Sequence, residues 1–433
     1  MQKNKKKIVY VGLSADIIHE GHINILKSAR KLGEVVVGLL TDTAITSYKN
    51  IPTLNFKQRE IIIKNIKLVK KVIPQKTLDY RPNLELLKPD FVVHGDDWKK
   101  GVQKQTREQV ISILKKWKGK LVEPKYTKNI SSTSIKARVI DNLIPSSRVS
   151  ILKRLLDSKK IVRFIEAHSP LSGLIVENVK YVRGKNIEQF DGMWSSSLTD
   201  SSVKGKPDNQ SLDFSSRFNG LGDLFDVTTK PLIFDADNGG RIEHLPFTIR
   251  TLERLGASSI MIEDKIGLKK NSLFSDQTDV KQDSIKDFCK KIDLIKQKRN
   301  SKDFLIGARI ESFILGKGLK DGLNRAKAYS EAGADLILIH SKEKTPKEIF
   351  SFSKIFKNTK YYKPLVSVPS TYSKTTEIEL IKNGFKIVIY ANHMLRAAYP
   401  AMQKAAENIL KFQRSDEIEN RISSVKDIIN LIK

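Results

Sequence analysis

Two kinds of hydrophobic pattern alternate along the first part of the chain. Short apolar runs lie at residues 8–13, 34–41, 71–74, 91–94 and 120–123, and segments of helical period lie between them, notably 23–32 and 56–69. Parallel strands need crossover connections, which are usually helices, so this alternation predicts a doubly wound parallel sheet with ligands at the carboxyl ends of its strands. We expect a Rossmann-like α/β domain over residues 1–142.

The second part of the chain contains eight strand-like runs, most of them separated by segments of helical period such as 319–332 and 376–383. The runs lie at 161–167, 192–196, 231–237, 258–264, 304–311, 335–341, 364–369 and 386–392. Eight βα units in this length predict a (β/α)₈ barrel. A Pro/Ser-rich turn at 142–147 interrupts the pattern, so we place the barrel domain at residues 146–433.

Polar residues occur at the carboxyl end of nearly every run in the second part. They are His168, Trp194, Ser195, Asp235, Asp237, Glu263, Asp264, Arg309, Glu311, His340, Asn392 and His393. Any one of them could be an ordinary strand-end cap. Because a barrel carries its active site at this face, the agreement between strands favours a site.

Three of these side chains form an oxygen-only set, since Asp235, Asp237 and Glu263 come without a cysteine. Such a set suits Mg²⁺ with several retained waters, and the alternative is that the carboxylates pair with the many lysines. Arg309 offers a forked donor for carboxylate or phosphate, and His340 offers a further donor. The pocket would concentrate positive charge on a doubly anionic ligand, as phosphoryl transfer requires.

The segment 263–272, which reads EDKIGLKKNS, directly follows the apolar run that ends at residue 262. A buried strand therefore ends in two carboxylates and opens into a loop rich in lysine, glycine and asparagine. This combination suits a Mg²⁺-bound anion that is covered by a mobile flap.

Eight strings of the second part, in this order, resemble the phosphoenolpyruvate mutase family of the isocitrate lyase superfamily over about residues 150–433. They are EAHSPLS from Glu166, MWSSSL from Met193, DADNG from Asp235, EDKIGLKKNS from Glu263, ARIESF from Ala308, IHSK from Ile339, VPSTY from Val368 and ANHMLRA from Ala391. The resemblance implies isomerisation of phosphoenolpyruvate to phosphonopyruvate. The lyases carry a cysteine in their gating loop and this chain does not, which disfavours carbon–carbon cleavage. Phosphonopyruvate hydrolase is the remaining alternative, and Asn271 favours the mutase.

The resemblance also implies roles for the site residues. Asp235 would hold Mg²⁺, with Asp237 and Glu263 acting through bound water. The residues implied around the substrate are Trp194 and the backbone of Ser196, Ser197 and Leu198 at the pyruvate carboxylate, Arg309, His340 and Asn271 at the phosphoryl group, Asp208 as the essential aspartate beside the migrating group, and Lys265, Lys269 and Ser272 in the flap. Ser197 stands where the family usually has glycine, and a positive φ there would cost about 1 kcal/mol.

In the first part, His19-Glu20-Gly21-His22 follows a strand and a short loop and opens a helix. Two histidines around a glycine let side chains and a helix N-terminus approach a triphosphate together, although a zinc fragment or a plain helix cap would read the same. Two further strings, HGDDW at 94–98 and ISSTSIK at 130–136, favour the phosphate interpretation. Together they resemble the nucleotidyltransferase family over about residues 7–140, and HGDDW resembles its glycerol-phosphate and ethanolamine-phosphate cytidylyltransferases.

This second resemblance implies that His19 and His22 stabilise the α-phosphate and the pyrophosphate leaving group. Lys49 would reach the same phosphates, with Arg59 as a second candidate. The residues implied at the nucleotide are Gly21, Lys49, Asp96, Ser131, Ser132 and Thr133. The chain departs from the family pattern where Tyr126 replaces an arginine, Asn129 replaces a glycine, and Leu13-Ser14-Ala15-Asp16 replaces Gly-Thr-Phe-Asp, which weakens the choice of CTP over ATP.

Charge and composition change this picture only slightly. The net charge of +30 is spread along the chain and comes mostly from lysine, so it suits a solvated surface that steers small anions better than a nucleic-acid site. The single cysteine, Cys289, excludes an intrachain disulfide and a cysteine-cluster metal site. We see no bilayer-length apolar run and no signal peptide, and we expect a cytoplasmic protein without a membrane partner.

The combination of the two parts resembles the bifunctional enzymes of phosphonate biosynthesis, including the fosfomycin pathway. The resemblance implies Mg²⁺ as cofactor and CTP as co-substrate. The other substrates would be small anions, namely phosphoenolpyruvate, phosphonopyruvate and a phosphonate alcohol or amine such as 2-hydroxyethylphosphonate. It also implies a homo-oligomer. The alternatives are a mutase whose first domain is not catalytic, and a basic nucleic-acid-associated protein.

Overall fold

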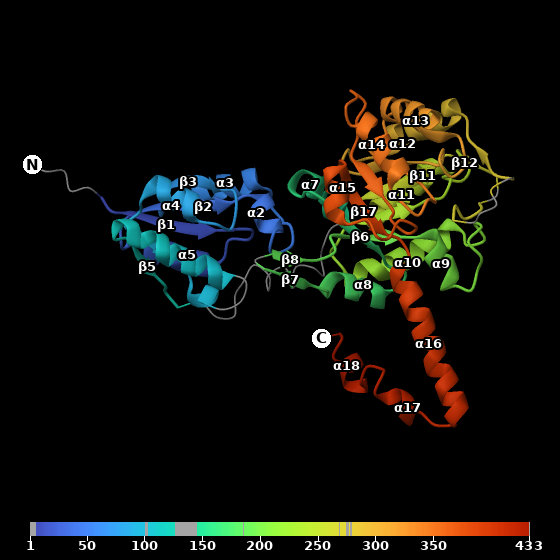
Figure 1. Ribbon diagram of the computed structural model, residues 1–433. Coiled ribbons are helices and arrows are strands. Elements are labelled where there is room, and N and C mark those ends of the chain that lie inside the picture. The colour runs from blue at the N-terminus through green and yellow to red at the C-terminus, as the bar shows by residue number, and fades with distance from the viewer. Residues whose placement is uncertain are drawn as a thin grey trace, which may run out of the picture.

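A computed structural model describes residues 6–99, 103–125, 145–184, 186–267, 269–273, 277 and 279–432. Its two main parts are a five-stranded parallel sheet with helices around it and a closed barrel of eight parallel strands (Figure 1). Both parts of the predicted fold class are therefore confirmed. The predicted boundary between residues 142 and 146 lies at the edge of the described chain and stays a prediction.

The first sheet has the strand order β3-β2-β1-β4-β5, all parallel. Its elements are β1 (Ile8–Leu13), α1 (Glu20–Arg30), β2 (Glu34–Leu40), α2 (Asp42–Thr46), α3 (Phe56–Lys64), β3 (Val69–Gln75), α4 (Arg81–Leu87), β4 (Phe91–Val93), α5 (Lys104–Leu114) and β5 (Lys120–Val122). Short 3₁₀ turns lie at Asp96–Lys99 and Lys115–Trp117. The strand order reverses between β1 and β4, so a ligand crevice is expected beyond the carboxyl ends of these two strands.

One predicted helix ends earlier than its hydrophobic period. The helical pattern over 56–69 predicted one continuous helix, but α3 stops at Lys64 and Asn65 caps it with an N–H that donates to the Ile62 carbonyl. Val69 instead begins β3, where it pairs with Val35 of β2. Strand pairing in the buried sheet therefore outweighs the helical period over the last residues of this segment.

The barrel closes in the order β10-β11-β14-β15-β16-β17-β6-β9. Its strands are β6 (Val162–Glu166), β9 (Gly192–Ser195), β10 (Leu232–Asp235), β11 (Ser259–Glu263), β14 (Leu305–Ile310), β15 (Leu336–Ile339), β16 (Leu365–Ser367) and β17 (Phe385–Tyr390). The helices around and between them are α8 (Pro170–Asn178), α9 (Ser197–Ser202), α10 (Phe214–Val227), α11 (Leu245–Leu255), α12 (Ile285–Lys298), α13 (Gly318–Ala332), α14 (Lys347–Phe356) and α15 (Glu377–Lys382). All eight predicted runs are strands of the barrel.

Helix α7 (Pro145–Ser158) precedes the barrel and lies on its side nearest the five-stranded sheet (Figure 1). Leu152, Leu155 and Leu156 of this helix are buried in the same cluster as the inward-facing residues of the strands. Ile51, from the first part of the chain, packs against this cluster as well. Helix α7 thus belongs to the barrel core and also contacts the first domain.

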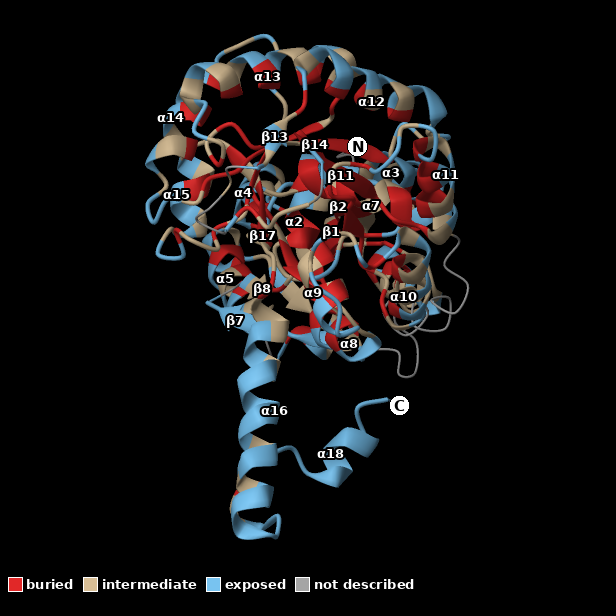
Figure 2. Ribbon diagram, turned by 90° about the vertical axis from the view of Figure 1, so that its right-hand side faces the viewer, coloured by how far each residue is buried: buried red, intermediate tan, exposed pale blue. Residues whose placement is uncertain are grey.

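Helix α16 (His393–Phe412) projects from the barrel, and none of its described residues is buried (Figure 2). Two short helices, α17 (Asp416–Glu419) and α18 (Val425–Ile429), follow it. The small antiparallel hairpins are β7 (Tyr181–Arg183) with β8 (Asn186–Glu188), and β12 (Lys265–Ile266) with β13 (Lys281–Gln282). Across the described ranges, every helix is too short or too polar to span a bilayer.

Candidate active site

The carboxylates at the ends of β10 and β11 form the floor of a site in the barrel. Asp235 and Glu263 are the last residues of these strands, and Asp237 follows two residues after Asp235. All three are buried. Asp237 has φ 51°, a left-handed conformation that few residues other than glycine, asparagine and aspartate adopt. Its N–H donates to Asp235 Oδ1 at 3.2 Å, so one tight turn holds both carboxylates.

Arg309 and His340 lie together beside this floor, as predicted. The Nη2 of Arg309 is 3.2 Å from Glu263 Oε2, donates to Ser272 Oγ at 2.8 Å and lies 3.1 Å from His340 Nδ1. Glu311, two residues further along, accepts from Ser272 Oγ at 2.7 Å and lies 2.9 Å from His340 Nδ1. Charged and polar groups from neighbouring strands and the flap therefore form one contact network.

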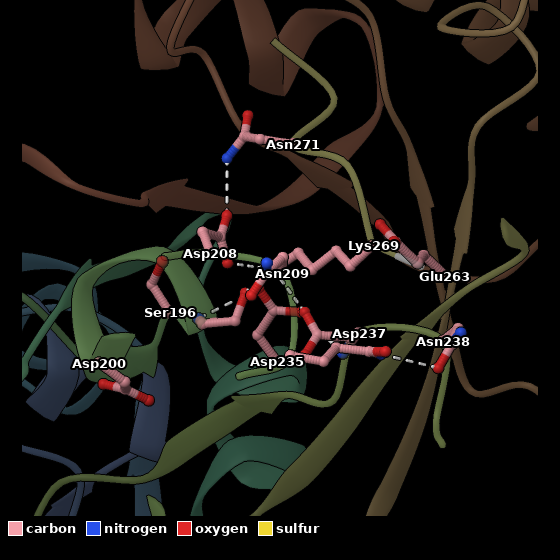
Figure 3. A network of polar contacts seen from close by, with 12 residues as sticks. Ser196, Asp200, Asp208, Asn209, Asp235, Asp237, Asn238, Glu263, Lys269 and Asn271 are labelled. Carbon is pink, nitrogen blue, oxygen red and sulfur yellow. Dashed lines mark hydrogen bonds and ion pairs between the residues drawn. The ribbon is translucent and has the colours of Figure 1, made fainter. Parts of the chain in front are cut away.

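The flap after β11 reaches down to the floor. Lys269 Nζ is 2.6 Å from Asp208 Oδ1 and 2.5 Å from Asp237 Oδ1, and it also donates to Ser197 Oγ. Asn271 Nδ2 donates to Asp208 Oδ2 at 2.8 Å (Figure 3). The structure thus brings the predicted flap residues and the predicted essential aspartate into direct contact.

Ser197, which stands where the family usually has glycine, lies at the start of a helix without a positive φ. It is the first residue of α9, follows Ser196 at φ −83°, and is not among the described residues with positive φ. The cost that a positive φ would bring to a serine at this position therefore does not arise in this backbone. The serine contributes a hydroxyl instead, which donates to Asp235 Oδ2 at 3.1 Å.

One cavity of about 70 Å³ connects these groups. The predicted site residues that line it are Trp194, Ser196, Ser197, Leu198, Asp208, Asp235, Lys269, Asn271, Ser272, Arg309 and His340. Asp237 and Glu263 are not among the lining residues. They form ion pairs with two residues that are, Lys269 and Arg309 respectively.

Burial and nearby charges shift the protonation of the floor in opposite directions. Burial alone would raise the pKa of Asp235, but Lys269 and Arg309 outweigh it and hold this pKa below its usual value. Burial raises the pKa of Glu263 to about 7, against the opposing effect of Arg309. Burial, assisted by Arg309, lowers the pKa of His340, so its imidazole is neutral at neutral pH. The pKa of Asp235 and the pKa of His340 are therefore both shifted down, which favours the ionised carboxylate and the neutral imidazole.

The second candidate site lies after β1, at the start of α1. His19 is the N-cap of this helix, and its Nδ1 accepts from the Gly21 N–H at 3.2 Å, while the His19 N–H donates to His22 Nδ1 at 3.4 Å. The two ring centroids are 4.0 Å apart. The motif is therefore a helix cap in structure, and the Nδ1 of each ring is engaged with the backbone of this cap. Burial lowers the pKa of His22 to about 4.

Lys49 and Arg59, the two predicted phosphate contacts, differ in their surroundings. Lys49 is exposed, and its Nζ lies 3.5 Å from Ser14 Oγ in the loop after β1. Arg59 is fully buried and donates to Asp42 at 2.6 Å and to the carbonyls of Ser14 and Leu54 at 2.5 and 3.1 Å. The Arg59 donors are therefore engaged in holding neighbouring loops together.

The HGDDW string directly follows β4 and lies beside the expected crevice. His94 stacks on Trp98 with centroids 3.9 Å apart and planes at 7°, and the indole N–H of Trp98 donates to Glu123 at 2.7 Å. Asp96 is the first residue of the 3₁₀ turn Asp96–Lys99, which also contains Trp98. The predicted nucleotide residues Ser131, Ser132 and Thr133, with Tyr126 and Asn129, lie outside the described residues.

Comparison with known proteins identifies the barrel. Residues 152–410 match the family described as phosphoenolpyruvate phosphomutase, which is more than half of the chain. The chain belongs to this family. It is 34% identical over 281 residues to the phosphoenolpyruvate phosphomutase of Tetrahymena pyriformis, covering 65% of this chain and 89% of that protein. It also resembles the solved structure of a phosphonopyruvate hydrolase complexed with oxalate and Mg²⁺, with 32% identity and a TM-score of 0.58 over 66% of this chain and 94% of that one.

The first domain matches a second family. Residues 10–138 match the family described as cytidylyltransferase-like. The ethanolamine-phosphate cytidylyltransferase of Dictyostelium discoideum is 35% identical over 143 residues, which is 32% of this chain and 38% of that protein. The protein is thus an enzyme of the phosphoenolpyruvate mutase superfamily with a cytidylyltransferase-like domain fused ahead of the barrel.

The donor set of the mutase-family barrel fits Mg²⁺ with retained water. The described residues contain no group of three or more histidine, cysteine, aspartate or glutamate side chains close enough to bind a metal together. Two buried carboxylate oxygens, Asp237 Oδ1 and Glu263 Oε2, have cationic partners, Lys269 at 2.5 Å and Arg309 at 3.2 Å. The ammonium group of Lys269 lies between Asp237 and Asp208, which shows that this part of the pocket accommodates a cation. Mg²⁺ commonly uses one or two carboxylates and completes its shell with water.

Arg217 is a site residue of the mutase-family barrel that the sequence analysis missed. It comes from α10, is buried, and donates to the Asp235 carbonyl at 2.6 Å, to Asp200 at 2.9 Å and to the Ser195 carbonyl at 3.2 Å. It therefore fixes the ends of β9 and β10 relative to each other. The available signal was an arginine at an inward position of an otherwise apolar helix face.

Proposed function

We propose that the barrel isomerises phosphoenolpyruvate to phosphonopyruvate. The observation that carries this proposal is the contact of Asp208 with both Lys269 and Asn271 of the flap, beside Arg309 and His340. An aspartate held by two flap residues would keep water away from a migrating phosphoryl group, and water is the reactant that separates a hydrolase from a mutase.

The proposed reaction moves one phosphoryl group within the substrate. The bond from phosphorus to the enol oxygen breaks, the pyruvate enolate forms, and its C3 then bonds to the same phosphorus. Arg309 and the neutral His340 would hold the phosphoryl oxygens, while the backbone of Ser196 to Leu198 would hold the pyruvate carboxylate. Positioning and charge neutralisation carry most of the catalysis of such a transfer.

We propose Mg²⁺ as the cofactor of this barrel, held by Asp235 directly and by Asp237 and Glu263 through water. When bound, it would supply positive charge to the oxygens of the pyruvate part of the substrate. Lys269 would then release Asp237 and keep its contact with Asp208. Exhaustive chelation should abolish the isomerisation, and full activity without divalent metal would refute this cofactor.

We also propose that the first domain transfers CMP from CTP to a phosphonate. His19 and His22 would contact the α-phosphate and the leaving pyrophosphate through Nε2, and Lys49 would contact the same phosphates. The phosphonate oxygen forms a bond to the α-phosphorus, and pyrophosphate leaves. Because His22 is neutral in the free protein, binding a triphosphate should raise its pKa and favour the protonated form.

Phosphorus NMR of the full chain tests the barrel. With Mg²⁺ and phosphonopyruvate, the expected product is phosphoenolpyruvate, because the equilibrium favours the ester over the carbon–phosphorus bond. Free phosphate and pyruvate as the main products would support the hydrolase alternative, which the similarity to a phosphonopyruvate hydrolase keeps relevant.

The same method tests the first domain with CTP and a phosphonate acceptor. We expect pyrophosphate and a CMP adduct only when an acceptor is present, with ATP as a poorer donor. We favour 2-hydroxyethylphosphonate slightly over 2-aminoethylphosphonate, and a competition between the two acceptors decides this. Preferential formation of the amino-bearing adduct would reverse the preference, and no adduct with any acceptor would support a non-catalytic first domain.

We further propose that the chain works as a cytoplasmic homo-oligomer that handles small anions and not nucleic acid. Helix α16 supports the assembly, because Tyr399, Met402 and Ile409 form an exposed apolar stripe at helical spacing on an element without buried residues. Light scattering of the full chain tests the assembly, and a monomer at all concentrations would refute it.

A further inference from the structure

The segment that carries Lys49 lies between the two domains. We call residues 47–54 the Lys49 segment. The Ile187 N–H of the barrel donates to the Ser47 carbonyl at 3.2 Å, and Gln189 Nε2 donates to Asn50 Oδ1 at 2.6 Å. Ile51 packs against the buried cluster that contains α7. The barrel therefore contacts this segment through a backbone bond, a side-chain bond and an apolar contact.

The far end of the Lys49 segment is held from two sides. On the barrel side, Arg154 of α7 donates from Nη2 to the Pro52 carbonyl at 2.6 Å and from Nη1 to the Thr53 carbonyl at 3.0 Å. On the nucleotide side, Asp16 Oδ1 accepts from the N–H of Thr53 at 2.6 Å and of Leu54 at 3.3 Å. Consecutive peptide groups are thus fixed between a carboxylate of the crevice and an arginine of the barrel.

The position of Asp16 connects this arrangement to the chemistry of the crevice. Asp16 lies three residues before His19, in the same loop as Ser14, which Lys49 contacts. The Arg154 guanidinium is half-buried beside Asp16 and Asp42, and burial still lowers its pKa although both carboxylates oppose this. Hydrogen bonds from a charged group in such surroundings are stronger than neutral ones, so they can restrict a loop that exposed backbone would leave free.

We infer that Arg154 of the barrel domain is a positioning residue for nucleotidyl transfer in the first domain, acting through the Lys49 segment. The inference rests on the proposed cytidylyltransferase function. According to this inference, the barrel domain catalyses its own reaction and also fixes the position of Lys49, the proposed triphosphate contact of the first domain. Arg154 contacts the backbone of the Lys49 segment and acts through it. Its effect is therefore expected on nucleotide binding more than on the chemical step.

The test uses the full chain with Arg154→Met, which keeps an unbranched apolar side chain and removes its donors. We expect the KM for CTP, and the Kd for CTP by calorimetry, to rise about tenfold, which is what loss of charged hydrogen bonds commonly costs. The kcat for CMP transfer should fall less, and backbone hydrogen exchange in residues 47–54 should become faster. Arg154→Lys should restore part of the affinity, because a lysine can still donate to one carbonyl.

The matched control is Lys153→Ala on the same helix. Lys153 forms an exposed ion pair at 2.8 Å with Asp303, which belongs to the same domain as α7. Loss of this ion pair should therefore leave CTP binding unchanged. Gln189→Leu gives a second route to the same conclusion if Arg154→Met folds poorly, because it removes only the bond to Asn50. Isomerisation by the barrel should change by less than about twofold in all these variants, since its site is distant.

The outcomes separate the inference from the proposed function. If wild type binds CTP but forms no adduct, the proposed transfer fails, while the Kd of the Arg154 variant still tests the positioning. Unchanged CTP affinity in both Arg154→Met and Gln189→Leu overturns the inference even if CMP transfer occurs. An equal loss of both activities with a lowered Tm, without rescue by Arg154→Lys, indicates a purely structural role and also overturns it. Absence of nucleotide binding by wild type overturns both.

Discussion

The two candidate sites lie at the carboxyl ends of parallel strands, yet they hold charge in different ways. In the barrel, opposite charges already touch, as between Lys269 and Asp237 at 2.5 Å and between Arg309 and Glu263 at 3.2 Å. In the first domain, His19 and His22 use Nδ1 for the backbone of their own helix. The charged groups of the barrel site are therefore paired with one another, whereas the two histidines of the crevice after β1 are held by hydrogen bonds to the backbone.

The barrel site lies on the side of the barrel that is away from the first domain. Helix α7 lies on the side of the barrel that faces the five-stranded sheet, and β12, at the base of the flap, lies on the far side (Figure 1). Changes at one site should therefore have nearly independent effects from changes at the other, except through the segment between the domains. This independence makes the comparison open to experiment.

The largest effect is expected in the barrel. Asp208→Ala should lower isomerisation by about 10³-fold, because it removes the carboxylate that Lys269 and Asn271 hold beside the phosphoryl site. Asn271→Ala should have a similar effect, and phosphorus NMR with phosphonopyruvate measures both. CMP transfer by the same variants serves as the control. Near-normal isomerisation by Asn271→Ala would show that the flap assignment is wrong.

A somewhat smaller effect is expected in the first domain. His19→Ala or His22→Ala should lower CMP transfer by about 10²-fold, the usual result of losing a preorganised donor to a developing charge. Pyrophosphate release from CTP with an acceptor measures this, and isomerisation should stay unchanged. If either substitution also impaired the barrel, the proposed independence of the sites would fail.

The next largest effect is expected when one carboxylate of the barrel floor loses its charge while the side chain keeps its shape. Asp237→Asn should raise the Mg²⁺ concentration needed for half-maximal isomerisation by about tenfold, as loss of an outer-shell partner often does. Asparagine accepts the left-handed backbone at φ 51°, so the fold should be unaffected. A Mg²⁺ titration of activity and calorimetric binding measure the shift. An unchanged Mg²⁺ dependence would remove Asp237 from the metal site.

The smallest effect is expected at a helix end whose left-handed capping residue is not glycine. Helices α11 and α13 end at glycines with positive φ, Gly256 and Gly333, whereas α4 in the first domain ends at Lys88 with φ 44°. Lys88→Gly should stabilise the first domain by about 0.5–1 kcal/mol, since glycine adopts this conformation without a Cβ penalty. Chemical denaturation of the full chain measures the free energy of unfolding of the first domain. A decrease in this free energy would contradict the argument.

The sequence predicted the architecture well because hydrophobic period is a local property of the chain. Every predicted barrel strand is present, and the one clear error, the helix over 56–69, arose where Val69 pairs with β2, which a local pattern does not contain. The site was predictable as far as strand ends and motifs reach. Arg217 was not, because its role depends on α10 crossing the ends of β9 and β10. The φ of Ser197 was likewise set by the start of α9 and not by the motif.

The left-handed backbone at Asp237 has a consequence for how this protein can evolve. If Asp237 has the proposed metal role, the position must satisfy two independent requirements, a backbone angle that favours glycine, asparagine or aspartate and a carboxylate at the floor of the site. Glycine and asparagine meet only the first requirement, and glutamate meets only the second. Aspartate alone meets both, so variation among descendants of this chain should stop at this residue for as long as the barrel keeps its chemistry.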